Sequence, residues 1–239
     1  MSVPHEKQAV VCVFCGAAAG NSPNHLEAAR ALAHELHKQK VHLVYGGGTV
    51  GIMGELARTL VSLSGPNAVH GIIPRALVEI EEGYKNTPDT KSDVPDAKNN
   101  TGKSAERVVA SSVHESDYGI VTVVPDMHTR KRLMAQKVLD GGEGSGFVAL
   151  AGGFGTVEEL MEMTTWNQLG IHKAGIVLLN INGYWDGLLQ WVQTSVKEGF
   201  VSRGNAGILA EATKVEDVLR MLREYRISSD RLALNWGQE

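Results

Sequence analysis

The stretch Leu150-Ala-Gly-Gly-Phe-Gly-Thr-Val-Glu-Glu-Leu160 decides the fold, because it joins two different hydrophobic patterns. Before it, Gly146–Leu150 is a short apolar run that predicts a buried strand. After it, apolar residues begin to recur at helical spacing. The glycines in between therefore lie where a strand leads into a helix. Glycine there lets backbone N–H groups turn toward an anion, and the positive end of the helix dipole favours a phosphate.

Length and composition fit one globular domain. The chain has 239 residues, 43% of them hydrophobic, which is enough to bury a full core. A net charge of −4 gives no electrostatic reason to expect nucleic acid or a membrane surface as a partner. We find neither a signal peptide nor an apolar run of membrane-span length, and we expect a cytoplasmic protein.

Two cysteines, Cys12 and Cys15, form a C-x-x-C pair within a probable strand and its exit. No second pair follows, so the pattern does not favour zinc. We expect reduced, packed thiols, with a redox role as the less favoured alternative. No metal and no cofactor are expected.

The chain alternates between apolar strands and amphipathic helices. The predicted strands are Val10–Phe14, Val41–Tyr45, Val69–Ile73, Ile120–Val124, Phe147–Leu150 and Gly175–Asn180. Helical stripes follow at Leu26–Leu36, Met53–Leu60, Met127–Leu139, from Leu160 onward, and at Val215–Tyr225, and Ser22-Pro23 supplies an N-cap and a first-turn proline for the first of them. Near-continuous apolar strands between helices indicate a parallel sheet covered on both faces. We therefore predict an α/β fold, a Rossmann-like doubly wound parallel sheet, as a single domain over residues 1–239.

One segment interrupts this alternation. Asn86 to Lys103 contains Pro88, Pro95 and many charges, with almost no apolar side chain. Such a stretch cannot offset its ordering entropy by burial, so we expect a flexible insertion at residues 86–104. A tolerated surface insertion is favoured over a lid.

A second glycine loop, Tyr45-Gly-Gly-Gly-Thr-Val-Gly-Ile-Met-Gly54, follows another predicted strand. Gly46, Gly48 and Gly51 satisfy G-x-G-x-x-G, which would suggest a dinucleotide site, but no acidic residue ends the next strand. No Gly-Lys-Ser/Thr follows, so it is not a Walker A loop. A phosphate or nucleoside against the backbone and tight strand–helix packing are equally good explanations.

Basic and sulfur-containing residues share one face of the helix that begins after Asp126, a plausible N-cap. Met127, Arg130, Lys131 and Met134 stand at i, i+3, i+4 and i+7. Such a face suits a flat apolar base beside a phosphate or ribose. On this segment alone, a solvated basic face is the favoured explanation.

The carboxylate of Glu159 stands one turn into the helix after the first glycine loop. Thr156-Val-Glu-Glu159 matches a capping box, which would explain both end residues without any chemistry. Glu158 lies about 100° further round the helix, so the two carboxylates cannot both face the loop. The residues alone predict a phosphate site and leave a catalytic carboxylate open.

The stretch AGGFGTVEE resembles the P-G-G-x-G-T-x-x-E signature of the LOG family, the cytokinin riboside 5′-monophosphate phosphoribohydrolases, often labelled "lysine decarboxylase-like". Other segments resemble the family in the same order, over about residues 9 to 210. They are Val11–Gly16, Tyr45–Gly48, Gly51–Gly54, Met127–Lys131, Thr165–His172, Gly183-Tyr-Trp and Glu198–Val201.

The resemblance implies hydrolysis of the N-glycosidic bond of an N6-substituted adenosine 5′-monophosphate, or of AMP, to a free base and ribose 5-phosphate. Glu159 would be the catalytic carboxylate and Arg130 its partner. The remaining residues would bind substrate: Gly152, Gly153, Gly155 and Thr156 at the 5′-phosphate, Met127 and Lys131 at the nucleoside, and Gly46, Gly47 and Gly48 below it. A homodimer is implied as well.

Three departures from the family pattern bear on this expectation. Ala151 replaces the signature proline, and Ala17 and Ala18 stand where serine is common. A missing hydroxyl would remove about 0.5–1.5 kcal/mol of binding. The alternative is a non-catalytic binder of nucleotide or of molybdenum cofactor, which needs no hydrolytic carboxylate. A pyridoxal-dependent decarboxylase is disfavoured, because no lysine is recognisable as a Schiff-base residue.

Overall fold

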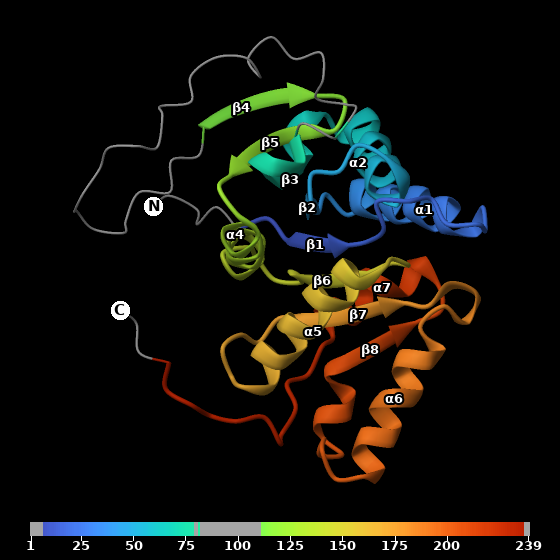
Figure 1. Cartoon of the computed structure of the whole chain (residues 1–239), viewed down its shortest axis with the longest axis vertical. Helices are drawn as coiled ribbons and strands as arrows, with labels where there is room; N and C mark the ends of the chain where they lie inside the picture. Colours follow the sequence, from blue (N-terminus) through green and yellow to red (C-terminus); the bar gives the residue numbers. More distant parts are fainter. Residues whose placement is uncertain (1–6, 79–80, 82–110, 237–239) are drawn as a thin grey trace, which may run out of the picture.

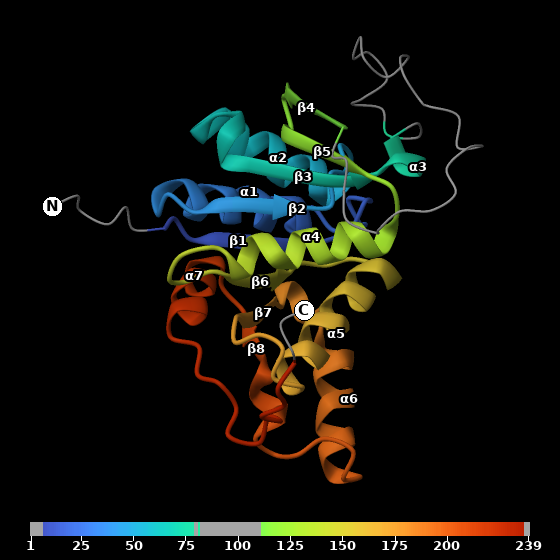
Figure 2. The ribbon, with the colours of Figure 1, turned by 90° about the vertical axis from the view of Figure 1, so that its left-hand side faces the viewer.

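The strands form one eight-stranded sheet in the order β4-β5-β3-β2-β1-β6-β7-β8, visible as a stack in Figure 2. The computed structural model describes residues 7–78, 81 and 111–236. The strands are β1 (Val10–Phe14), β2 (His42–Tyr45), β3 (Val69–Pro74), β4 (Ser111–Ser116), β5 (Gly119–Val124), β6 (Gly146–Ala149), β7 (Gly175–Leu179) and β8 (Leu209–Ala212). The helices are α1 (Asn24–Lys38), α2 (Gly51–Ser64), α3 (Arg75–Val78), α4 (Met127–Leu139), α5 (Phe154–Gln168), α6 (Asp186–Lys197) and α7 (Val215–Arg223).

The predicted parallel sheet is confirmed, with one correction at its edge. All neighbouring strands from β5 to β8 pair in parallel, whereas β4 is antiparallel to β5. The sequence reading did not identify β4, β8 or α6. Strand β4 (SSVHES) is mostly polar, and β8 (LAEA) lacks a continuous apolar run. Helix α6 (DGLLQWVQTSVK) has a strongly amphipathic sequence. Residues 86–104 lie outside the described residues.

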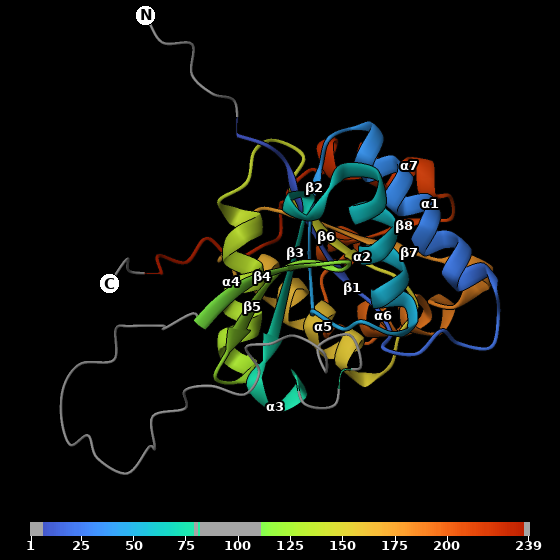
Figure 3. The same ribbon diagram turned by 90° about the horizontal axis from the view of Figure 1, so that it is seen from above.

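Each central strand supplies side chains to two separate hydrophobic clusters. Val11 and Val13 pack with helices α1, α2 and α7, whereas Cys12 and Phe14 pack with α4, α5 and α6. Figure 1 shows the strand order from another side, and Figure 3, seen from above, shows α1, α2 and α7 on one side of the sheet and α4 on the other. Burial on both faces explains why the strands are almost uniformly apolar.

The two thiols belong to this core. Cys12 and Cys15 are free and buried, as expected. Burial raises the pKa of both thiols, so neither has the thiolate character that redox chemistry needs.

The beginning of α1 differs by one residue from the prediction. The helix starts at Asn24 with Pro23 in the N-cap position, and Ser22 Oγ accepts a 3.4 Å bond from the Asn24 N–H. Helix α7 ends at Arg223, two residues before the predicted end.

The order of the strands fixes where a ligand can bind. The chain runs from β1 outward to β2 and β3, and then returns to β6 on the other side of β1. The loops after β1 and β6 therefore diverge at their carboxyl ends and leave a crevice between them. The stretch Leu150–Leu160 leaves the sheet at this point.

Candidate active site

The centre of the site is a buried ion pair between α4 and α5. Arg130 Nη2 lies 3.0 Å from Glu159 Oε1, and the two side chains are only 10% and 8% exposed. Arg130 Nε and Glu159 Oε1 make no hydrogen bond within the described part of the chain. Buried polar groups normally have a hydrogen-bond partner, so the ion pair at 3.0 Å is the interaction that offsets the burial of Glu159 Oε1.

The capping box predicted for Thr156 and Glu159 is wrong. Helix α5 begins at Phe154 with Gly153 as N-cap, and no side chain caps it. Thr156 is therefore already inside the helix, and Glu159 is turned toward Arg130 instead of the helix end. The structural explanation for Glu159 is thus removed, and the carboxylate is left at the edge of the glycine loop.

Burial sets the electrostatics of Glu159. Burial raises the pKa of its carboxyl, and the charge of Arg130 offsets part of that rise. Glu158, the next residue, is half exposed and pairs with Lys131. The predicted divergence of the two carboxylates is therefore observed.

The second glycine loop, Tyr45–Gly54, packs against Arg130. A Cβ at Gly46 would lie 2.1 Å from Arg130 Nη2, so only glycine leaves room for the guanidinium in this position. Gly47 has a φ of +76°, and a Cβ at Gly48 would lie 2.6 Å from Met53 Cε. Tight packing, one of the two explanations left open for this loop, is therefore observed, and the close approach to Arg130 links the loop to the candidate site.

Helix α4 carries the basic face predicted from the sequence, and Asp126 caps it by accepting the Thr129 N–H at 2.8 Å. Arg130 Nη1 donates to Met127 Sδ at 3.7 Å, and Met127 is 41% exposed beside it. Lys131 has a different environment, because its Nζ lies 3.2 Å from Glu162 Oε2 and also pairs with Glu158. The structure thus brings Met127 to the Arg130–Glu159 pair and turns Lys131 toward α5.

The two glycine loops differ in the surroundings of the first backbone N–H groups of the helix that follows each of them. At α2, the Ile52 and Met53 N–H groups donate to the Gly16 carbonyl at 3.2 and 3.3 Å. At α5, by contrast, a Cβ on Gly153 or Gly155 would meet nothing within 4 Å. The first N–H groups of a helix have no acceptor inside it. The open amino end of α5 is therefore the better phosphate site.

Glu81 is a further carboxylate beside the second glycine loop, and the sequence does not predict it. Its Oε2 accepts both the Thr49 N–H and the Thr49 hydroxyl, each at 2.8 Å. A second carboxylate thus lies against the loop that also contacts Arg130. The sequence reading looked for an acid at the end of β3, but Glu81 comes seven residues after Pro74, beyond α3, and no sequence pattern indicates it.

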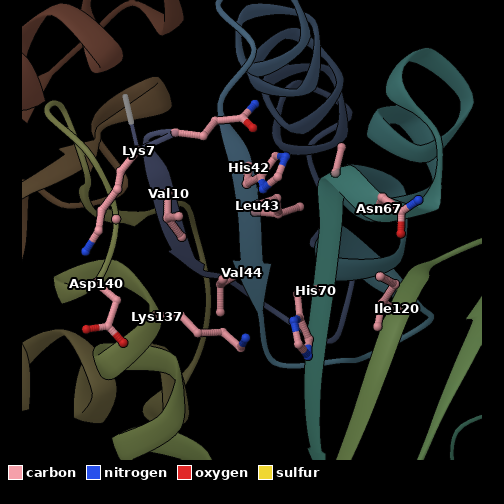
Figure 4. A pocket seen from close by; sticks show the side chains of 13 residues that line it. Lys7, Val10, His42, Leu43, Val44, Asn67, His70, Ile120, Lys137 and Asp140 are labelled. Carbon is pink, nitrogen blue, oxygen red and sulfur yellow. The ribbon is translucent and has the colours of Figure 1, made fainter. Parts of the chain in front are cut away.

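A cavity of about 400 Å³ lies at the opposite end of the sheet (Figure 4). His42 and His70, near the starts of β2 and β3, line it together with Lys137 near the end of α4. Amino ends of strands are far from the crevice where the glycine loops meet, and none of the predicted site residues lines this cavity. It is not the candidate active site.

No described helix is long and apolar enough to cross a membrane.

Comparison with known proteins supplies the family. Residues 53–222 match a family model described as "Possible lysine decarboxylase". The chain is 36% identical over 230 residues to cytokinin riboside 5′-monophosphate phosphoribohydrolase LOG7 of Arabidopsis thaliana, covering 95% of this chain and 88% of that protein. It is 47% identical over 230 residues to a "Bifunctional cytokinin biosynthesis protein" of Fusarium pseudograminearum. This covers 96% of the chain but 43% of that relative, so the chain spans less than half of its length.

Solved structures agree on the fold. A molybdenum cofactor carrier protein from Chlamydomonas reinhardtii superposes with a TM-score of 0.55 at 18% identity, over 91% of this chain and 97% of that one. A molybdenum cofactor binding protein from Rippkaea orientalis gives 0.55 at 15% identity, over 91% and 97%. At such identities the likeness shows the fold alone. The sequence relatives go further: the chain belongs to the LOG family, the cytokinin riboside 5′-monophosphate phosphoribohydrolases.

Proposed function

We propose that this chain hydrolyses the N-glycosidic bond of N6-substituted adenosine 5′-monophosphates, releasing the free base, an active cytokinin, and ribose 5-phosphate. The observation that carries the proposal is the buried Arg130–Glu159 pair, 3.0 Å apart, beside the open amino end of α5. Family membership supplies the reaction, and the nearness of a buried carboxylate to the open start of a helix supports the assignment of these residues to it.

Glu159 provides the charge that the reaction needs. As the C1′–N9 bond breaks, its electron pair leaves with the base, and positive charge develops on the ribose as in glycoside hydrolysis. A carboxylate at this point stabilises that charge and takes a proton from the attacking water, whose oxygen bonds to C1′. The departing base takes up one proton at nitrogen, which balances the proton removed from the water, so that one water molecule is added across the C1′–N9 bond. The raised pKa of Glu159 makes it a better proton acceptor than an ordinary glutamate, while Arg130 favours its ionised form.

The other residues bind and orient the nucleotide. Gly153, Gly155 and Thr156 present the first-turn N–H groups of α5 to the 5′-phosphate. The half-exposed Met127 offers an apolar surface to the base next to the Arg130 guanidinium. In this proposal Lys131 acts through its ion pairs with Glu158 and Glu162, which hold α4 against α5.

The carrier alternative has less support. The molybdenum cofactor carrier and binding proteins share this fold at 15–18% sequence identity. An identity this low supports a common fold and gives no support for a common ligand. A carrier would also have no use for a carboxylate that is buried against an arginine at the phosphate loop.

A homodimer and a cytoplasmic location accompany the proposal. Phe154, at the mouth of the site, is 97% exposed, and an apolar side chain in this position favours coverage by a second copy. Sedimentation of the purified protein tests the dimer, and a fluorescent fusion tests the location.

Release of base from N6-isopentenyl-AMP and from AMP, followed by chromatography, tests the function. We expect release by the wild type and loss of at least a hundredfold in Glu159→Gln, which keeps the shape but not the charge. Glu216→Gln, at an exposed position of α7, is the matched control and should behave as wild type. No release by well-folded wild type would refute the hydrolase, and nucleotide binding without turnover would favour the carrier.

A further inference from the structure

Gly152 is held from several sides, unlike the glycines that follow it. A Cβ at Gly152 would lie 2.1 Å from Thr156 Oγ1 and 2.9 Å from Gly16 N. Gly153 and Gly155 have open space around the same position. The loop is therefore fixed where it leaves the sheet and open where we expect the phosphate.

Tyr184 makes the remaining contact to this fixed point. Its hydroxyl donates a hydrogen bond to the Gly152 carbonyl, although the two residues are 32 positions apart. Tyr184 comes from the connection between β7 and α6, within the segment Gly183-Tyr-Trp that resembles the family but has no role in the proposed mechanism. A side chain from another part of the fold therefore reaches the phosphate loop.

The ring of Tyr184 is itself held on two sides. It meets Trp185 edge-on at 4.9 Å between ring centroids and His25 of α1 edge-on at 5.6 Å. Edge-to-face pairs of this kind favour one ring orientation. The hydroxyl therefore has a defined direction even though the side chain is 45% exposed.

The position of Tyr184 is tied to the sheet through its neighbour. Trp185 is 3% exposed, and its backbone N–H donates to Asn180 Oδ1 at 2.8 Å. Asn180, directly after β7, donates in turn to Asp186 at 2.8 Å and Glu211 at 2.6 Å. This network connects the end of β7 to the loop after β6, two strands that lie side by side.

We propose that Tyr184 is a positioning residue for the 5′-phosphate: by holding the Gly152 carbonyl, its hydroxyl fixes the direction in which the Gly153–Thr156 N–H groups point. The inference rests on the proposed function for the identity of the ligand. It assigns to Tyr184 no contact with the reacting atoms. Its effect therefore falls on phosphate affinity and spares the affinity for the base.

Tyr184→Phe tests this, because it removes the hydroxyl and keeps the ring against His25 and Trp185. We expect the dissociation constant of ribose 5-phosphate, measured by calorimetry, to rise about fivefold, as one lost hydrogen bond implies. The dissociation constant of adenine, which has no phosphate, should stay within twofold of the wild-type value. The kcat should also stay within twofold, while KM for the nucleotide should rise by the same factor as the dissociation constant of ribose 5-phosphate. Tyr225→Phe, the matched removal of a hydroxyl elsewhere, should change none of these.

The outcomes separate the two proposals. A weaker ribose 5-phosphate complex with an unchanged adenine complex and melting temperature supports the positioning role, whether or not base release is detected. Unchanged ribose 5-phosphate affinity overturns it, as does an equal loss for both ligands, which would mean a general structural role. Absence of base release by the wild type refutes only the hydrolase.

Discussion

Adding one methyl group at Gly46 should disable the site while leaving the fold intact. The Cβ of Gly46→Ala would lie 2.1 Å from Arg130 Nη2, 3.0 Å from Arg130 Cζ and 3.2 Å from Met53 Sδ. These atoms belong to flexible side chains, so they can move without disturbing the backbone. Gly46 does not have a positive φ, and alanine is therefore unstrained there.

The size of the effect follows from how far Arg130 must retreat. Relief of the clash moves the guanidinium by about 1 Å, and a displacement of that size in a catalytic group costs on the order of 10²-fold in rate. Since Nη2 lies 3.0 Å from Glu159 Oε1, a movement of that size changes the geometry of the ion pair. We expect kcat/KM for N6-isopentenyl-AMP to fall about a hundredfold, which corresponds to about 2.7 kcal/mol of transition-state stabilisation.

The assay combines base release with thermal unfolding. Gly187→Ala is the matched control, because a Cβ there meets nothing within 4 Å and the residue lies in α6. Adding Gly46→Ala to Arg130→Ala should have little further effect, since both changes act through the same side chain. Near-normal activity of Gly46→Ala, or full multiplication of the two losses, would refute the reasoning.

Three other predictions concern binding and stability. Gly155→Ala should weaken ribose 5-phosphate binding at least tenfold, because its Cβ enters the open space at the first turn of α5 where we expect the phosphate. Thermal stability should stay equal or rise, because the Cβ meets no other atom and alanine favours a helix. Unaltered binding would argue against a phosphate at this position. His172 Nε2–H donates to the Met163 carbonyl at 2.9 Å, while Nδ1 accepts the Ala174 N–H at 3.2 Å. Burial lowers the pKa of His172 to about 4, below the unfolded value of about 6.5. The stability is therefore complete above pH 6.5 and falls by about 2 kcal/mol by pH 5, because the unfolded chain takes up the proton first. Urea titrations at pH 8 and pH 5 should show this loss, and His172→Asn should reduce the difference between them. Leu56→Ala, in the middle of α2 and fully buried, should lower the free energy of unfolding by about 2–5 kcal/mol in the same titration, and a loss below 1 kcal/mol would contradict the packing described for the α1–α2 face.

The sequence by itself determined the class of the fold and the place of the glycine turn that leads from β6 into α5. Strands such as Val10–Phe14 are buried on both faces, so their composition is visible without knowing what packs against them. The glycines Gly152, Gly153 and Gly155 can also be recognised from the sequence, because few other residues suit a tight turn from a strand into a helix. The extent of a single domain over residues 1–239 stays a prediction.

Only the tertiary structure decided which residues come together at the candidate site. The local spacing is compatible with Glu159 as the last residue of a capping box and also as a catalytic carboxylate. Only the position of α4 shows that Glu159 pairs with Arg130. Glu81 and Tyr184 could not be found from the sequence, since each reaches its loop from a segment 32 residues away. Contacts of this kind depend on how β3, β6 and β7 are ordered in the sheet, and no local pattern of residues encodes that order.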